Sequence, residues 1–178
     1  MKPLLDVPVT APGCLELVVS SPLRRTVQTS LGAVRLWIES EAGRRLLLNA
    51  DLQETGEVAC DSGSPLEELK EYFKDDASLI DFDELWPDWH LKQGDFVDMG
   101  PALRNRLQRF TAWLLARPER SILVVAHHNL LVILLGVTFK NCEVRQFALQ
   151  QDGTYEASVP QVSESDSELS EADLKHLK

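Results

Sequence analysis

The order of apolar and polar positions along the chain predicts strands that alternate with helices. Three short apolar runs end at turn signals, as strands do, and they cover residues 16–20, 44–52 and 121–126. Four segments carry apolar side chains mostly at helical spacing, and they cover residues 23–40, 66–73, 101–117 and 129–137. Strands that alternate with helices indicate an α/β fold, with a mostly parallel sheet and helices on both faces.

Three further details concern single segments. The run at 121–126 is continuously apolar and rich in β-branched residues, which is typical of a strand buried on both faces. The Ser-Gly-Ser-Pro sequence at 62–65 predicts a turn and an N-cap for the helix that follows. Residues 75–100 mix acids with tryptophan, proline and glycine, so we expect a long ordered loop of the kind that often serves as a lid.

The C-terminal part is predicted to contain a hairpin and a tail. Residues 143–149 and 154–159 alternate between apolar and polar around a turn at 151–153, which is a hairpin signal. Residues 160–178 are acidic and offer almost no core side chains, so we expect a disordered tail. The expected domain therefore covers residues 1–159.

Charge is distributed unevenly, and this narrows the possible partners. The formal net charge is −10, yet residues 51–95 alone carry 14 acidic and 3 basic side chains. Residues 1–50 (6 basic, 4 acidic) and 96–159 (7 basic, 5 acidic) are slightly basic. Because nucleic acids and anionic membranes bind clustered Lys and Arg, we expect neither as a partner, whereas a single small anion fits the basic segments. The arginines of the helix over 101–117 are expected on its solvated face: Arg104, Arg106 and Arg109.

The cysteines and the hydropathy pattern indicate a cytoplasmic protein. No apolar run reaches the roughly 18 residues of a membrane helix, and the N-terminal residues lack the apolar core of a signal peptide. Cys14, Cys60 and Cys142 are widely spaced and form no Cys-x-x-Cys, so we expect reduced thiols rather than disulfides or a zinc site. Neither a metal nor another cofactor is expected, and the pattern does not indicate an oligomeric state.

Three segments with chemically useful residues follow the carboxyl ends of predicted strands, where open α/β sheets place their ligands. The first carries Arg24 and Arg25 in the first turn of the helix over 23–40. Cations there oppose the helix dipole unless an anion binds, so this turn could be a phosphate receptor. The alternative is a pair of solvated surface arginines.

The other two segments offer a histidine and an acid. His127 ends the strand over 121–126, and His128 follows it; adjacent residues that leave a strand point in opposite directions, so the pair is a poor metal chelate. The alternative for His127 is a purely structural histidine. Glu54 follows the strand over 44–52, and a neighbouring anion would favour its protonated form, which could donate a proton to a leaving oxygen. The alternative is a solvated carboxylate in an acidic block.

With these residues the chain resembles the histidine phosphatase superfamily, also described as phosphoglycerate mutase-like. Residues 21–26 (Ser-Pro-Leu-Arg-Arg-Thr) are similar to the family segment with a phosphate-binding arginine, here Arg25. Residues 124–127 (Val-Val-Ala-His) are similar to the strand that delivers a phosphate-contacting histidine, here His127. Leu-Gln-Glu at 52–54, followed by Cys-Asp-Ser-Gly-Ser at 60–64, is similar to the segment that carries the proton donor, here Glu54. The resemblance covers about residues 4–150.

The resemblance implies a phosphomonoesterase or a phosphomutase. In this family a histidine of an Arg-His-Gly motif attacks phosphorus and forms a phosphohistidine, while arginines and histidines hold the phosphoryl oxygens. An acid protonates the leaving group, and no metal is required. The implied roles are phosphate binding for Arg25 and His127 and proton donation for Glu54, with phosphate or a small phosphorylated metabolite as the partner.

The chain also departs from the family pattern, because it contains no Arg-His-Gly. Its four histidines are His90, His127, His128 and His176. A stretch similar to the one that normally follows the nucleophile includes Asp6, Pro8, Thr10 and Gly13. We therefore expect the first central strand, with its histidine, and a helix after residue 13 to be missing. That would leave unpaired sheet edges, and hence a rearranged sheet, aggregation or a partner strand.

Three interpretations follow from this departure. The chain is a phosphatase or mutase by descent with little or no turnover, or it is a non-catalytic pseudoenzyme that binds a phospholigand or a partner. The third interpretation is an incomplete product of a longer gene.

Overall fold

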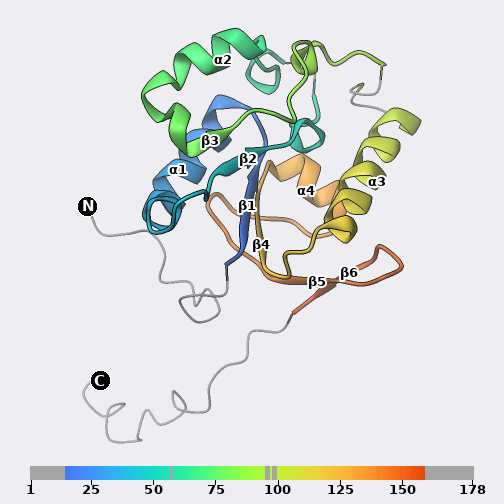
Figure 1. The fold of residues 1–178 in the computed structure, drawn as a ribbon. Coiled ribbons are helices and arrows are strands. Elements are labelled where there is room, and N and C mark those ends of the chain that lie inside the picture. Colours follow the sequence, from blue (N-terminus) through green and yellow to red (C-terminus); the bar gives the residue numbers. More distant parts are fainter. Residues whose placement is uncertain (1–14, 57, 95–96, 98–99, 159–178) are drawn as a thin grey trace, which may run out of the picture. The chain divides into compact units, whose positions relative to one another are not determined.

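The computed structural model describes residues 15–56, 58–94, 97 and 100–158 (Figure 1). These residues fall into two compact units, divided between Glu143 and Val144. The stretch around Asp6 to Gly13 and the expected tail at 160–178 lie outside the described residues, as does the expected domain boundary at 159.

The first unit is built around a four-stranded sheet. Its strands are β1 (Leu17–Ser20), β2 (Leu46–Leu48), β3 (Ile80–Asp81) and β4 (Ile122–Val125). They lie in the order β3-β2-β1-β4, and all neighbouring pairs are parallel. This arrangement confirms the predicted α/β class with a mostly parallel sheet.

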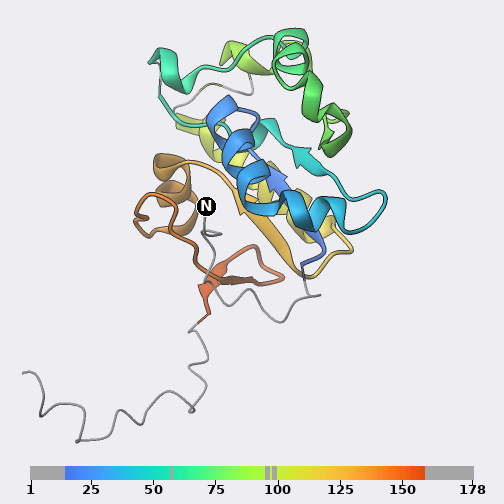
Figure 2. The same ribbon diagram turned by 90° about the vertical axis from the view of Figure 1, so that its left-hand side faces the viewer.

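Helices cover both faces of this sheet (Figure 1). They are α1 (Arg24–Glu39), α2 (Leu66–Tyr72), α3 (Gly100–Ala116) and α4 (His128–Leu135). Because successive strand residues face opposite ways, Val18 packs in one core cluster with α1 and α2, whereas Val19 packs in another with α3 and α4. Figure 2 looks onto the first face, where α1 lies in front of the strands.

The second unit contains the predicted hairpin. Strands β5 (Phe147–Leu149) and β6 (Tyr155–Ala157) pair antiparallel, with Phe147 opposite Ala157. The amide of Gln150 donates to the Thr154 carbonyl at 2.9 Å and closes the turn. The alternation of the sequence and its Gly-containing turn were therefore sufficient to predict this element.

Two segments differ from their predicted structure. Residues 44–52 form a shorter strand than expected, and residues 75–100 contain regular elements where a loop was expected. Of the apolar run at 44–52 only β2 forms a strand, because the Asn49 side chain accepts the amide of Asp51 at 2.8 Å and starts a 3-10 turn, Ala50–Leu52. The segment expected as one long loop contains β3, which adds to the edge of the sheet beside β2. It also contains the 3-10 turns Lys74–Leu79 and Trp89–Leu91. A further 3-10 turn, Ala59–Asp61, precedes α2.

Two expectations about burial and capping were wrong. Strand β4 is partly exposed along its whole length, because β1 is its only partner among the described strands. The apolar helix predicted after β4 is present as α4, and Leu130 is its only fully buried residue. At the start of α2 the N-cap position is held by Pro65, which has no side-chain oxygen to accept a backbone amide, so Ser64 does not cap the helix.

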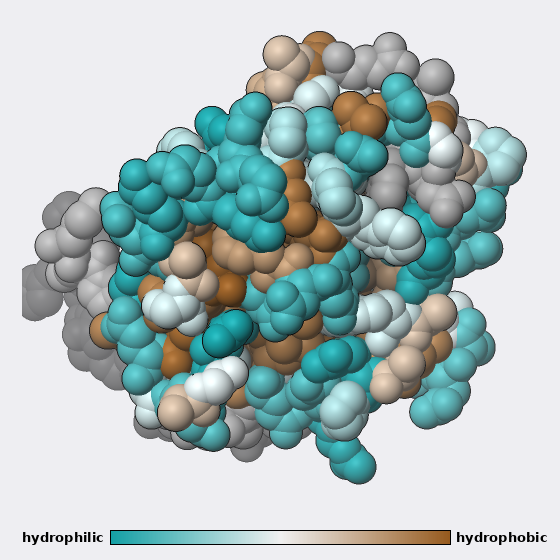
Figure 3. All heavy atoms as spheres, turned by 45° about the horizontal axis from the view of Figure 1, so that its top comes forward, coloured by the Kyte–Doolittle hydropathy of each residue, from teal (hydrophilic) through white to brown (hydrophobic). Residues whose placement is uncertain are grey.

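The surface of the described residues is mixed in polarity. Figure 3 shows hydrophilic side chains over much of the face that carries α2, with apolar residues visible between them. Large apolar side chains on the surface include Leu36 and Trp86, which are 83% and 70% exposed. No helix among the described residues has the length and apolar character needed to cross a membrane.

Candidate functional site

The candidate site lies at the carboxyl ends of β1, β2 and β4. These strands are parallel neighbours, so the loops that follow them meet at one edge of the sheet. Two backbone hydrogen bonds join these loops: Ser21 donates to the Val125 carbonyl at 2.9 Å, and Asn49 donates to the Ser20 carbonyl at 3.0 Å. The sheet therefore brings together the segments that carry Arg25, Glu54 and His127.

Arg25 and His127 are in direct contact. The Nε of Arg25 donates to Nδ1 of His127 at 3.2 Å, and Nη2 of Arg25 lies 2.9 Å from the same nitrogen. A guanidinium has no acceptor, so Nδ1 must be the unprotonated nitrogen of the ring. The proton of the neutral imidazole is then on Nε2, which lies 2.8 Å from the Ser21 hydroxyl oxygen and donates to it.

The surroundings of His127 keep its ring neutral. Its side chain is only 5% exposed, and burial is the largest cause that lowers the pKa of His127, to about 3. The positive charges of Arg25, Lys92 and Arg106 lower it further. Arg25 thus contacts an uncharged imidazole, and the positive charges of Lys92 and Arg106 act on the same ring, so an added anion would be stabilised there.

Arg25 has additional partners in the 3-10 turn before α2. Its Nη1 donates to the carbonyl of Cys60, and its Nη2 donates to Oδ1 of Asp61 at 3.1 Å. The start of α1 explains why such partners are needed: the N-cap, Leu23, has no capping side chain, and no acid lies in the first turn. Asp61 supplies the negative charge that the helix itself lacks.

Glu54 is buried at the same edge. Its side chain is 6% exposed, and Oε1 accepts the backbone amides of Thr55 at 2.8 Å and Leu130 at 3.1 Å. Leu130 is in the first turn of α4, directly after His127. Glu54 and His127 therefore meet the same helix end, so the structure brings all three predicted site residues to one region.

Lys92 and Arg106 were not singled out as site residues from the sequence. Lys92 donates through Nζ to the carbonyls of Glu54 at 2.9 Å and Gly56 at 2.6 Å. Arg106 is fully buried and donates to the Gln53 carbonyl at 3.2 Å, so its expected place on a solvated face was wrong. Arg106 follows Leu103 by three residues, and this helical spacing was the signal for its inward position.

Arg24 and His128, which are adjacent in sequence to Arg25 and His127, have other contacts. Arg24 stacks over Tyr72 at 4.4 Å from its ring centre and lies 4.0 Å from Glu68. His128 is exposed, and its Nδ1 is 2.9 Å from the Phe139 carbonyl. The strand geometry correctly predicted that one histidine of the pair would face the site and the other would not.

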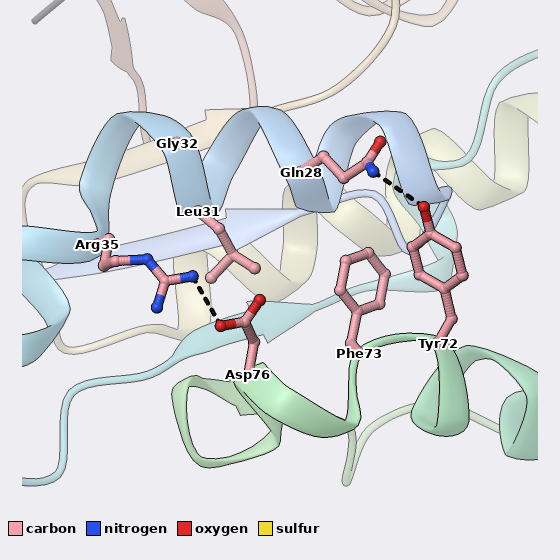
Figure 4. A pocket seen from close by; sticks show the side chains of 7 residues that line it. All are labelled: Gln28, Leu31, Gly32, Arg35, Tyr72, Phe73 and Asp76. Carbon is pink, nitrogen blue, oxygen red and sulfur yellow. Dashed lines mark hydrogen bonds and ion pairs between the residues drawn. The ribbon is translucent and has the colours of Figure 1, made fainter. Parts of the chain in front are cut away.

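A separate pocket lies between α1 and the end of α2 (Figure 4). Two polar pairs flank it: Gln28 with Tyr72 at 3.0 Å, and Arg35 with Asp76 at 2.7 Å. The carboxylate of Asp76 already neutralises Arg35, and the pocket shares no residue with the site around His127. Among the residues that the structure describes, no group of three or more His, Cys, Asp and Glu side chains is placed to hold a metal ion.

The parallel sheet with helices on both faces defines a protein of the α/β class, and Arg25 contacts His127 at the carboxyl edge of this sheet. A family model described as the histidine phosphatase superfamily (branch 1) matches residues 10–171. The chain therefore belongs to the histidine phosphatase superfamily, as its motifs suggested. Comparisons with curated proteins and with solved structures gave no significant match.

Proposed function

We propose that this protein binds the phosphoryl group of a small phosphomonoester at the site formed by Arg25 and His127. By descent its chemistry is that of a phosphomonoesterase or phosphomutase that acts through phosphohistidine. The observation that supports this most strongly is the contact of Arg25 with the buried His127, at 3.2 and 2.9 Å, together with the positive charges of Lys92 and Arg106, which also lower the pKa of His127. Positioning and charge stabilisation of this kind account for most of the catalysis of phosphoryl transfer.

Each residue has a role that follows from its chemistry. A phosphoryl oxygen that enters between Arg25 and His127 would accept from the guanidinium and replace Nδ1 as its partner. Released from Arg25 and placed beside an anion, His127 can take up a proton and donate to a second oxygen. In the family reaction a histidine nitrogen bonds to phosphorus as the P–O bond breaks, and a protonated Glu54 would donate its proton to the leaving oxygen in that step.

Turnover by this chain is proposed to be weak. The family reaction needs a histidine nitrogen that attacks phosphorus, and the sequence contains no Arg-His-Gly. His127 is the histidine in contact with Arg25, and both of its ring nitrogens are engaged, by Arg25 and Ser21. This favours the second candidate function, a non-catalytic phospholigand-binding protein.

Calorimetry with inorganic phosphate and vanadate tests the binding function. We expect binding by the wild-type protein, loss of binding in Arg25→Ala, and an unchanged affinity in Arg24→Ala, because Arg24 pairs with Glu68 outside the site. Absence of phosphate and vanadate binding by the wild-type protein would contradict the proposal.

A turnover assay separates the two candidate functions. The protein would be incubated with p-nitrophenyl phosphate and a panel of sugar phosphates, and released phosphate would be measured for wild type and His127→Ala. We expect little or no release. Robust release that disappears in His127→Ala would exclude the non-catalytic candidate and point to His127 as a substitute nucleophile.

A further inference from the structure

We propose that Asp61 is a positioning residue, which together with the Cys60 carbonyl fixes the guanidinium of Arg25 so that one edge faces the phosphate. This inference rests on the proposed function and deepens it. It assigns a positioning role to the turn before α2, where the Cys60 carbonyl and Asp61 contact Arg25.

The contacts divide the guanidinium into two edges. Cys60 and Asp61 accept from Nη1 and Nη2, which form the outer end of the group. Nε and Nη2 form the side edge, and both approach Nδ1 of His127. Arginine recognises phosphate through two parallel hydrogen bonds from such an edge, so its rotation matters as much as its charge. The contacts at the outer end leave the side edge directed to the place where the phosphoryl oxygen would enter.

The turn that carries Asp61 is itself held in place. The Asp61 carboxyl group lies against Gly56, where a Cβ would come within 2.7 Å of Oδ2. Two residues beyond Asp61, Gly63 lies against the indole of Trp89, and a Cβ there would be 2.1 Å from the ring. Trp89 is fully buried. The carboxylate is therefore presented to Arg25 by a fixed support.

Because Asp61 also bears a negative charge, it could instead compete with phosphate for Arg25. If its carboxylate competed with phosphate for Arg25, removal of the side chain would tighten phosphate binding. If it positions Arg25, removal would weaken binding, because the half-exposed guanidinium becomes free to rotate. The two roles differ in the sign of the effect, so one titration distinguishes them.

The test is the dissociation constant for inorganic phosphate, measured by calorimetry at constant ionic strength. We expect Asp61→Ala to raise it about tenfold, in line with the loss of a hydrogen bond to a charged group. Asp61→Asn keeps an acceptor oxygen and should stay within about threefold of wild type. Asp51→Ala is the matched control and should leave the dissociation constant unchanged. The Asp51–Arg109 pair has nearly the same side-chain exposure (14% and 41%) as the Asp61–Arg25 pair (16% and 44%).

Phosphate binding by Asp61→Ala in an Arg25→Lys variant shows whether Asp61 acts through Arg25. In Arg25→Lys the charge remains but the two-edged fork is lost, so Asp61→Ala should change phosphate affinity less than about twofold there. Wild-type binding that Asp61→Ala leaves unchanged or tightens would overturn this inference alone. No phosphate binding by the wild-type protein would overturn the proposed function, and this inference with it.

Discussion

Arg25 donates to Nδ1 of His127 through two of its nitrogens, at 3.2 and 2.9 Å, and this requires an imidazole that carries no proton on Nδ1. A positively charged ring would place two cations in contact in a buried site. The His127 ring next to Arg25 is therefore neutral, and this protonation state can be measured through the proton equilibrium of His127.

The first prediction concerns stability at acid pH. The pKa of His127 is about 3 in the folded protein and about 6.5 in an unfolded chain, so the unfolded state binds the proton more tightly. The contribution of His127 is complete above pH 6.5 and is lost as the pH falls toward 3, by up to about 5 kcal/mol in total. Urea unfolding at pH 7, 6, 5 and 4 should show a smaller loss of stability in His127→Asn than in wild type. Equal losses would show that His127 is not held neutral.

The second prediction concerns the coupling of anion and proton. An anion between Arg25 and His127 favours the charged imidazole and so raises the pKa of His127. Sulfate is a suitable probe, because its charge is constant between pH 5 and 8. Its affinity should increase as the pH falls from 8 to 5, and calorimetry in buffers of different ionisation enthalpy should detect proton uptake. In His127→Asn the pH dependence should disappear; if it persists, another group takes up the proton.

The third prediction concerns the buried cation of α3. Arg106→Met removes the donor to the Gln53 carbonyl and a positive charge near His127, and it leaves a buried acceptor unpaired. We expect a loss of about 1–3 kcal/mol in the free energy of unfolding, together with weaker phosphate binding. Arg109 lies on the same helix as Arg106, is half-exposed and pairs with Asp51 of the 3-10 turn after β2. Arg109→Met should cost about 1 kcal/mol or less and leave binding unchanged. Chemical denaturation and calorimetry on both variants check this, and equal effects would contradict it.

The sequence was sufficient for features that depend on local pattern. The spacing of apolar residues predicted α1 and α3 to within one residue at each end. The position of Arg25, Glu54 and His127 after strands predicted that they would meet, because parallel strands end at one edge. Turn residues predicted the β5–β6 hairpin.

Features that depend on distant contacts were not predictable in this way. Asp61 is 36 residues from Arg25, and nothing in the pattern of either segment indicates their ion pair. Strand β3 has only two residues, so its alternation cannot be recognised, and it exists because it pairs with β2. The exposure of β4 depends on which strands lie beside it rather than on its own apolar sequence.

The last prediction compares two glycines whose surroundings differ. A Cβ at Gly63 would lie 2.1 Å from the Trp89 ring, whereas a Cβ at Gly32, in the exposed face of α1, would have no neighbour within 4 Å. Gly63→Ala should therefore destabilise the protein by about 1–3 kcal/mol, since the buried indole or the turn must shift. Gly32→Ala should stabilise it by about 0.5–1 kcal/mol, because alanine loses less conformational entropy in a helix.

Thermal and chemical unfolding of both variants measure these changes. Because the turn at Gly63 also carries Asp61, Gly63→Ala should weaken phosphate binding as well, while Gly32→Ala should leave it unchanged. The double variant Gly63→Ala with Trp89→Leu should cost less than the two single changes added together, because the smaller leucine relieves the clash with the new methyl group. Additive costs would show that Gly63 and Trp89 do not act on each other, and that the support of the Asp61 turn lies elsewhere.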